Sequence, residues 1–128
     1  MIVFDASVII ALHETTHRRH ADAEAIVRSH GLEDYCISVV TAAEAMVYRA
    51  RAGQLDQAEA DFRRLEIAIE PVPATVAGGL AAMRGTMRLK MSDVIVLDLA
   101  LRHRATLATF DLTLATAARE AGLRVIGA

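Results

Sequence analysis

The sequence predicts an α/β protein in which helices cover both faces of a central, mostly parallel sheet, giving three layers. Two observations support this fold class. Short apolar segments alternate with longer amphipathic segments along the chain, and no linker or low-complexity segment interrupts them. Strands separated by helices pair in parallel, because each helix carries the chain back across the sheet. At 128 residues with 54% apolar content, we expect residues 1–128 to form a single domain.

Two strands and four helices are predicted in the first half of the chain from its apolar periodicity. The expected ranges are 1–4 and 35–38 for the strands, and 7–13, 17–29, 41–51 and 55–65 for the helices. Gly31 and Gly53 follow two of these helices, where glycine commonly ends a helix. Glu44 follows Thr41 at capping-box spacing, which predicts a helix start at residue 41.

The second half is expected to add three strands and three helices. A strand beginning at Ile67 must stop near Pro71 and Pro73. Ser92 is a plausible N-cap for a helix that is apolar on nearly every face and should therefore be central. The expected ranges are 67–72, 106–110 and 124–126 for the strands, and 74–87, 93–103 and 112–121 for the helices.

The composition indicates which cellular compartment and which kinds of partner to expect. Cys36 is the one cysteine, so no intrachain disulfide is possible and a reducing cytoplasm is expected. No signal-peptide pattern or membrane-spanning run is visible, so no membrane association is expected. The net charge of −2 gives no general attraction to nucleic acid. Local attraction is possible, because nearly all cations are arginines and several are clustered, as at Arg18 and Arg19.

Four carboxylates stand where a parallel strand should end or a helix should begin: Asp5, Glu44, Asp93 and Asp111. In an open parallel sheet, strand ends and the following helix starts share one edge, so these residues should meet there. Each also has a structural alternative. Asp5 and Asp111 suit N-caps, Asp93 suits the helix dipole, and Glu44 suits the capping box.

The cost of gathering four negative charges favours a bound cation. Two unit charges about 4 Å apart repel by roughly 1 kcal/mol in water and about 4 kcal/mol at an effective dielectric constant of 20. A helix dipole offsets up to about 1 kcal/mol of this. Oxygen ligands without histidine or cysteine select Mg²⁺, or Mn²⁺, and such ions commonly bind phosphate oxygens. Asp5 and Asp93 are the expected direct ligands, with Glu44 and Asp111 as further possible ligands.

Two hydroxyls flank the acids and could support them. Ser7 follows Asp5 by two residues and Thr109 precedes Asp111 by two, so each could donate a hydrogen bond to a ligating carboxylate. Ser7 could equally cap a helix. Asp98 lies about 140° around its helix from Asp93 and is expected to form a partly buried ion pair, for which an arginine is the candidate partner. The alternative is an accessory metal ligand.

Three histidines have a spacing that could imitate a zinc site on one helix face. They are His13, His17 and His20, but residues 14–16 look like a break between two helices. We therefore expect no shared metal at these histidines, and surface or substrate contacts for His17 and His20.

The ordered acids resemble those of the PIN domain, in particular ribonuclease toxins of the VapC type. The resemblance runs from MIVFDASVIIAL through SDVIVLDLALRHRATLATFD and covers essentially the whole chain. It implies a PIN-like α/β/α sandwich and a magnesium-dependent endoribonuclease that cleaves RNA. It also implies the toxin of a type II toxin–antitoxin pair, usually a homodimer that a VapB-type antitoxin inhibits.

Carried over residue by residue, the resemblance implies a catalytic set of acids with two supporting hydroxyls. The implied acids are Asp5, Glu44, Asp93 and Asp111, and the implied hydroxyls are those of Ser7 and Thr109. Asp98 departs from the family pattern, which more often has a small residue there.

Other classes fit the residues less well. A receiver domain needs paired acids after the first strand, where Asp5 stands alone, and a haloacid-dehalogenase-type phosphatase needs an aspartate where Ser7 stands. The remaining alternative is a PIN-like binding or scaffold module without catalytic activity.

Overall fold

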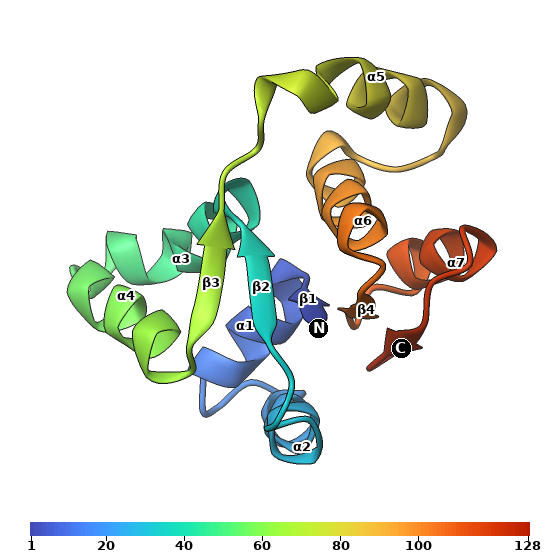
Figure 1. Ribbon diagram of the computed structural model, residues 1–128. Helices are drawn as coiled ribbons and strands as arrows, with labels where there is room; N and C mark the ends of the chain where they lie inside the picture. Colours follow the sequence, from blue (N-terminus) through green and yellow to red (C-terminus); the bar gives the residue numbers. More distant parts are fainter.

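Five parallel strands form the central sheet of the computed structural model, which describes residues 1–128 (Figure 1). The strand order is β3-β2-β1-β4-β5. The strands are β1 (Ile2–Phe4), β2 (Tyr35–Ser38), β3 (Ile67–Glu70), β4 (Thr106–Ala108) and β5 (Val125–Ile126). β1 lies at the centre, where Ile2 is opposite Tyr35 on one side and Thr106 on the other. The predicted parallel sheet is confirmed.

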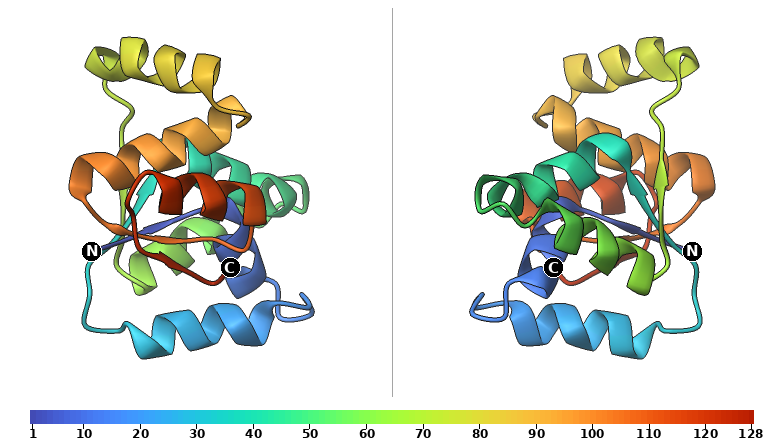
Figure 2. Two further views of the ribbon diagram at one scale, coloured as in Figure 1. Left: turned by 90° about the vertical axis from the view of Figure 1, so that its right-hand side faces the viewer. Right: turned by 90° about the vertical axis from the view of Figure 1, so that its left-hand side faces the viewer.

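Helices cover both faces of this sheet, which confirms the three-layer sandwich. Figure 2 shows α6 and α7 on one side of the strands, α2 and α4 on the other, and α5 beyond α6. The helices are α1 (Ala6–His13), α2 (His20–Ser29), α3 (Val39–Arg51), α4 (Leu55–Arg64), α5 (Ala77–Thr86), α6 (Met91–His103) and α7 (Leu112–Glu120), and a 3₁₀ turn, η1 (Ala74–Val76), precedes α5.

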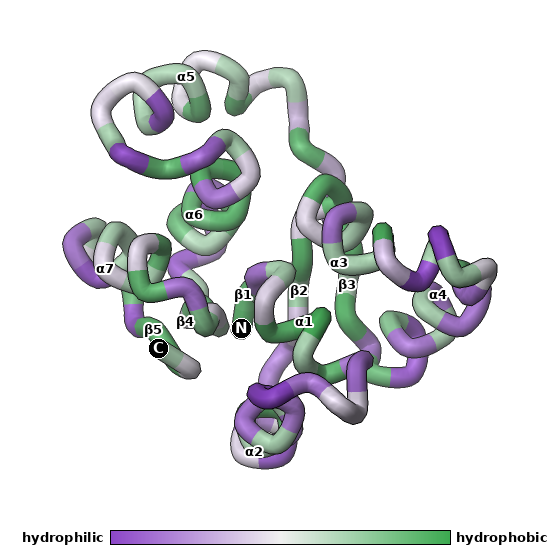
Figure 3. The backbone as a smooth tube through the Cα atoms, turned by 180° about the vertical axis from the view of Figure 1, so that it is seen from behind, coloured by the Kyte–Doolittle hydropathy of each residue, from purple (hydrophilic) through white to green (hydrophobic).

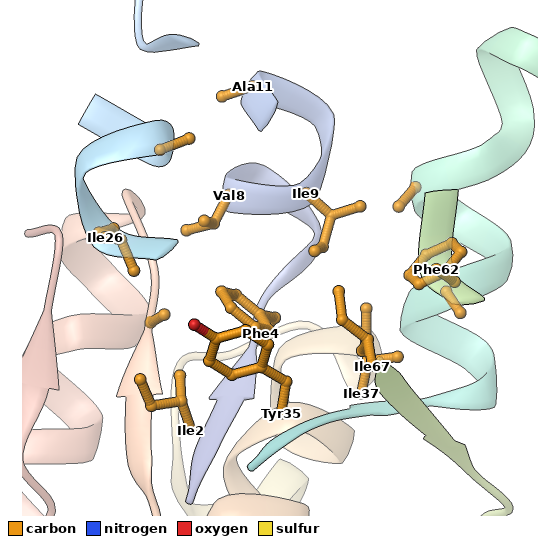
Figure 4. Close-up of a cluster of buried hydrophobic side chains, with 14 residues drawn as sticks. Ile2, Phe4, Val8, Ile9, Ala11, Ile26, Tyr35, Ile37, Phe62 and Ile67 are labelled. Atoms are coloured by element: carbon orange, nitrogen blue, oxygen red, sulfur yellow. The ribbon is translucent and has the colours of Figure 1, made fainter. Parts of the chain in front are cut away.

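Alternate residues of the strands divide the core into two clusters. Ile2 and Phe4 pack with α1 to α4 on one face, whereas Val3 packs with α6 and α7 on the other, because successive strand side chains point to opposite faces. In Figure 4, Phe4 lies against Tyr35 beneath Val8 of α1. The Phe4 and Tyr35 rings meet edge to face at 5.2 Å. Burying each large apolar side chain contributes roughly 1.5–3 kcal/mol.

The central elements are the most hydrophobic. β1 and β2 are coloured as hydrophobic in Figure 3, whereas α4 at the rim carries hydrophilic residues. α6 buries six of its residues, including Val94 and Leu97, as its apolar sequence predicts. No helix is both long and apolar enough to cross a membrane.

The predicted helix starts at residues 41 and 93 are wrong. α3 begins at Val39, and its N-cap is Ser38, whose Oγ accepts a 3.3 Å hydrogen bond from the Val40 amide. The capping box at Thr41 therefore does not form. α6 begins at Met91 after Lys90, so Ser92 lies inside the helix and is not its N-cap.

Four other predicted ranges are shortened or divided. β3 ends at Glu70 rather than at residue 72, before Pro71 and Pro73. β4 ends at Ala108 rather than at residue 110, because the chain bends at Phe110 toward α7. α2 begins at His20 rather than at residue 17. η1 and α5 together replace the single helix predicted at 74–87.

Candidate active site

Four acidic side chains line one cavity at the carboxyl edge of the sheet. The cavity has a volume of about 210 Å³ and its acids are Asp5, Glu44, Asp93 and Asp111. Asp5 follows β1, Glu44 lies on α3, Asp93 lies in the first turn of α6, and Asp111 precedes α7. The structure thus brings together the four carboxylates that the sequence predicted would meet.

Asp5 is 7% exposed, and its carboxylate is held by two hydroxyls. Its Oδ2 accepts hydrogen bonds from Ser7 Oγ at 2.8 Å and from Thr109 Oγ1 at 2.9 Å. Asp5 occupies the N-cap position of α1, but its side chain makes no capping hydrogen bond. The capping alternative for Asp5 is therefore wrong, and both hydroxyls orient the acid.

The same two hydroxyls tie Asp5 to the segment between β4 and α7. Ser7 Oγ accepts a hydrogen bond from the Phe110 amide at 3.1 Å, and Thr109 Oγ1 accepts one from the Asp111 amide at 3.0 Å. Ser7 therefore does not cap α1. Each hydroxyl donates to the carboxylate and accepts from the backbone, so its direction is fixed.

Asp93 is 9% exposed, and its pKa is raised above the ordinary value. Burial is the main cause, and the negative charges of Asp5, Asp111 and Glu44 raise the pKa further, against the opposing charge of Lys90. Crowded like charges in a poorly solvated place disfavour ionisation. This cavity therefore carries negative charge that the protein does not fully compensate.

Asp111 caps a helix, whereas Glu44 does not. Asp111 caps α7, because its Oδ1 accepts hydrogen bonds from the amides of Thr113 at 2.8 Å and Leu114 at 3.2 Å. The capping alternative is correct for this residue, which also lines the cavity. Glu44 is exposed, and it caps no helix because α3 begins five residues earlier.

Several residues predicted to lie outside the site do so. Asp98 pairs with Arg102 on α6 at 2.8 Å, which confirms the expected ion pair. His13 packs edge to face on Phe62, whereas His20 Nδ1 lies 2.8 Å from the Ala11 carbonyl oxygen. α1 ends at His13 and α2 begins at His20, so the three histidines do not share one helix face.

Sequence reasoning missed three residues that line the cavity: Thr41, Lys90 and Ser92. Thr41 Oγ1 is buried without a hydrogen-bond partner. Lys90 precedes α6 and lies near Asp93, so it places one positive charge among the acids. Lys90 could have been recognised from the sequence, because it stands three residues before Asp93.

A second, more basic hollow adjoins the acidic cavity. It has a volume of about 350 Å³, and His17, Arg18 and Arg19 line it. It shares Ser7, Ile10 and Asp111 with the acidic cavity. Cationic side chains thus lie directly beside the carboxylates. A larger hollow of about 610 Å³ lies between Thr86–Leu89 and α7, but it lacks a group of acids.

The donor set fits a hard divalent cation. The acidic side chains supply only carboxylate oxygens, and no histidine or cysteine lines the cavity. Such ligands suit Mg²⁺ or Mn²⁺ better than Zn²⁺. The raised pKa of Asp93 also indicates that positive charge would be favourable here.

Several solved structures share this fold. A toxin–antitoxin complex from Klebsiella pneumoniae contains a chain 25% identical, with 87% of each chain covered and a TM-score of 0.72. VapC20 of Mycobacterium tuberculosis, a sarcin-ricin loop cleaving toxin, is 18% identical over 91% of this chain and 95% of its own, with a TM-score of 0.76. FitAcB from Neisseria gonorrhoeae is 23% identical over 98% and 96%, with a TM-score of 0.72.

No curated protein sequence matches the chain. The family model of the PIN domain, however, matches residues 2–120. This range includes β1 to β4 and all four acids of the cavity. The chain therefore belongs to the PIN domain family.

Proposed function

We propose that this protein is a magnesium-dependent endoribonuclease and the toxin of a toxin–antitoxin pair, acting as a single domain over residues 1–128. The observation that carries the proposal is the cavity in which Asp5, Glu44, Asp93 and Asp111 meet. Family membership and the likeness to toxins in solved structures support it.

Asp5 and Asp93 would hold the ion, because they are the two buried acids of the cavity. Glu44 and Asp111 would complete the acidic set, and Mn²⁺ could replace Mg²⁺. When bound, such an ion supplies an activated water and neutralises charge that develops on a phosphodiester. Ser7 and Thr109 hold the Asp5 carboxylate in one orientation, so its free oxygen is presented without rearrangement.

The basic hollow is suited to the RNA backbone. Arg18 is exposed there, and arginine contacts phosphate oxygens in a bidentate manner. Arg19 is fixed by a 2.6 Å ion pair with Asp22 and lies 4.0 Å above the Phe110 ring. These contacts would position a phosphodiester beside the acids, where Lys90 adds a further positive charge.

The proposed function also implies the partners of the protein and its location in the cell. We expect a VapB-type antitoxin to inhibit the protein, a homodimer to be the assembled form, and the cytoplasm to be the compartment. Support for the antitoxin comes from the toxin–antitoxin complexes of similar fold.

The decisive experiment measures RNA cleavage by purified, antitoxin-free protein with Mg²⁺, with Mn²⁺ and with EDTA. Wild-type protein should cut cellular RNA only with metal, and Asp5→Asn and Asp93→Asn should abolish both cutting and toxicity on expression. Asp98→Asn is the matched control, because Asp98 lies on the same helix as Asp93 but pairs with Arg102 outside the cavity. Failure of the wild-type protein to cut, with both variants equally toxic, would instead identify a binding or scaffold module.

A further inference from the structure

A second cluster of potential metal ligands lies away from the acidic cavity. It consists of Cys36 on β2, Glu70 at the end of β3 and His103 at the end of α6. Their sulfur, oxygen and nitrogen ligand atoms all lie within 4.8 Å of one another. These residues are far apart in the sequence, so the fold alone brings them together.

The sheet and α6 position each member. Cys36 is 1% exposed and points to the same face as Val94 and Leu97 of α6. In the parallel register, Cys36 is opposite Ala68, so Glu70 lies one side-chain repeat further along β3. His103 Nε2 approaches Glu70 Oε2 at 2.8 Å, and Cys36 Sγ lies within 4.8 Å of a ligand atom of each of these two residues.

We propose that Cys36, Glu70 and His103 form a Zn²⁺ site that clamps the edge strand β3 to α6. Sulfur and imidazole ligands favour zinc over magnesium, so this site would not compete for the ion of the acidic cavity. His103 follows Asp93 by ten residues, which places the two sites about 15 Å apart along the helix. The inference therefore does not rest on the proposed ribonuclease activity.

Zinc geometry would require ligand atoms that lie up to 4.8 Å apart to approach one another by about 1 Å. Zinc bonds of about 2.0–2.3 Å in a tetrahedral arrangement place ligand atoms roughly 3.4–3.7 Å apart. The 2.8 Å contact between His103 and Glu70 must therefore open by less than 1 Å. Their side chains are 29% and 30% exposed, so they can move and leave a fourth position for water.

Zinc binding would displace the proton of the Cys36 thiol. Burial and the Glu70 carboxylate raise the pKa of the Cys36 thiol to about 12, so the metal-free protein holds a neutral thiol. On binding, the S–H bond breaks and a Zn–S bond forms, and the thiol proton leaves to solvent. Glu70 Oε2 and His103 Nε2 would then bind the metal in place of their hydrogen bond to each other, with the proton of the neutral imidazole on Nδ1.

Cobalt is a suitable probe, because a thiolate bound to Co²⁺ gives a charge-transfer absorption that carboxylate ligands do not. Titration of metal-free protein should give this band with one equivalent of Co²⁺, and Zn²⁺ should remove it. Cys36→Ser should abolish the band. His103→Gln and Glu70→Gln change partly exposed side chains, and each should weaken binding by at least about tenfold.

Two control variants separate this site from others. Asp93→Asn removes an acid of the cavity and should leave the band unchanged, whatever the outcome of RNA cleavage. His30→Gln changes a histidine at the end of α2 and should also have no effect. Zn²⁺ should raise the melting temperature of the wild type but not of His103→Gln. Absence of the band, or unchanged binding in both His103→Gln and Glu70→Gln, would overturn the proposal and leave a hydrogen-bonded cluster only.

Discussion

Thr109 donates a hydrogen bond to Asp5 across a sequence separation of 104 residues, with 2.9 Å between Thr109 Oγ1 and Asp5 Oδ2. Thr109 is fully buried, and its hydroxyl also accepts from the Asp111 amide. Two acids of the cavity thus depend on one hydroxyl. The parallel pairing of β1 with β4 makes this contact possible.

Thr109→Val tests that dependence, because it removes the hydroxyl and keeps the branched shape. We expect RNA cleavage to fall by about 10- to 100-fold, as for other groups that orient metal ligands. The unpaired Asp111 amide should cost about 1–3 kcal/mol of stability. Thr116→Val is the control, since Thr116 lies exposed on α7 and bonds only the Leu112 carbonyl. Equal activity of the two variants would refute the orienting role.

Replacements of Asp111 should separate its cap from its place in the cavity. Asparagine caps helices about as well as aspartate, so Asp111→Asn should keep the stability of α7, whereas Asp111→Ala should cost about 1 kcal/mol. Both variants should reduce RNA cleavage. Urea unfolding and cleavage assays on the same preparations check this, and full activity in Asp111→Asn would assign the residue a capping role alone.

Asp93→Asn should stabilise the metal-free protein at neutral pH. The pKa of Asp93 is raised above 3.8 by burial first and then by the neighbouring acids, so the folded protein binds this proton more tightly than the unfolded chain. Stability is therefore lost as the pH rises from 3.8 through the raised pKa. The asparagine side chain does not titrate, so the variant does not lose stability in this pH range. Its higher stability relative to the wild type should therefore vanish below pH 3.8.

Urea unfolding in EDTA between pH 3.5 and 7.5 measures the difference. Asp98→Asn serves as control, because its exposed i,i+4 pair with Arg102 should contribute only about 0.3–0.5 kcal/mol. An Asp93→Asn variant less stable than wild type at pH 7 would contradict the expectation.

His13 should make the fold sensitive to mild acid. Burial lowers its pKa below 6.5, against an opposing effect of Asp61, and Arg49 and Arg64 lower it further. The neutral ring is favoured on folding, so stability is complete above pH 6.5 and is lost as the pH falls through the lowered pKa. Both ring nitrogens are buried without partners.

Replacing the imidazole with an apolar ring removes the stability that is lost on protonation, and it also removes the two unpartnered ring nitrogens. His13→Phe should raise stability by about 1 kcal/mol at pH 8 and lose less stability than wild type between pH 7 and 5. Thermal unfolding at several pH values checks the slope. An unchanged slope would show that another group causes the acid sensitivity.

Arg18→Ala should weaken RNA binding without changing cleavage at saturating RNA. Removing one phosphate contact should lower the slope of log affinity against log salt by about 0.7 for a single strand. Arg63→Ala is the matched control, because Arg63 is exposed on α4, away from the basic hollow. Equal effects of the two variants would mean that general charge, rather than this hollow, attracts RNA.

Asp5 and Asp111 could be predicted from sequence because each directly precedes a recognisable helix, and Asp93 because it lies in the first turn of the apolar helix α6. Thr41 and Glu44 misled the prediction of a helix start, since a capping-box spacing occurs there inside the first turns of α3. The cluster of Cys36 with Glu70 and His103 could not be predicted, because it depends on strand register and on how α6 crosses the sheet.

The hydrogen bonds that link Asp5 to residues 109–111 have a consequence for biosynthesis. A nascent chain that still lacks β4 and the start of α7 has neither Asp111 nor Thr109, which is one of the two hydroxyl donors to Asp5. Such a chain cannot assemble the acidic cavity, even though Asp5, Glu44 and Asp93 have already been translated. The acidic cavity therefore forms only after the fourth strand has emerged and paired with the first.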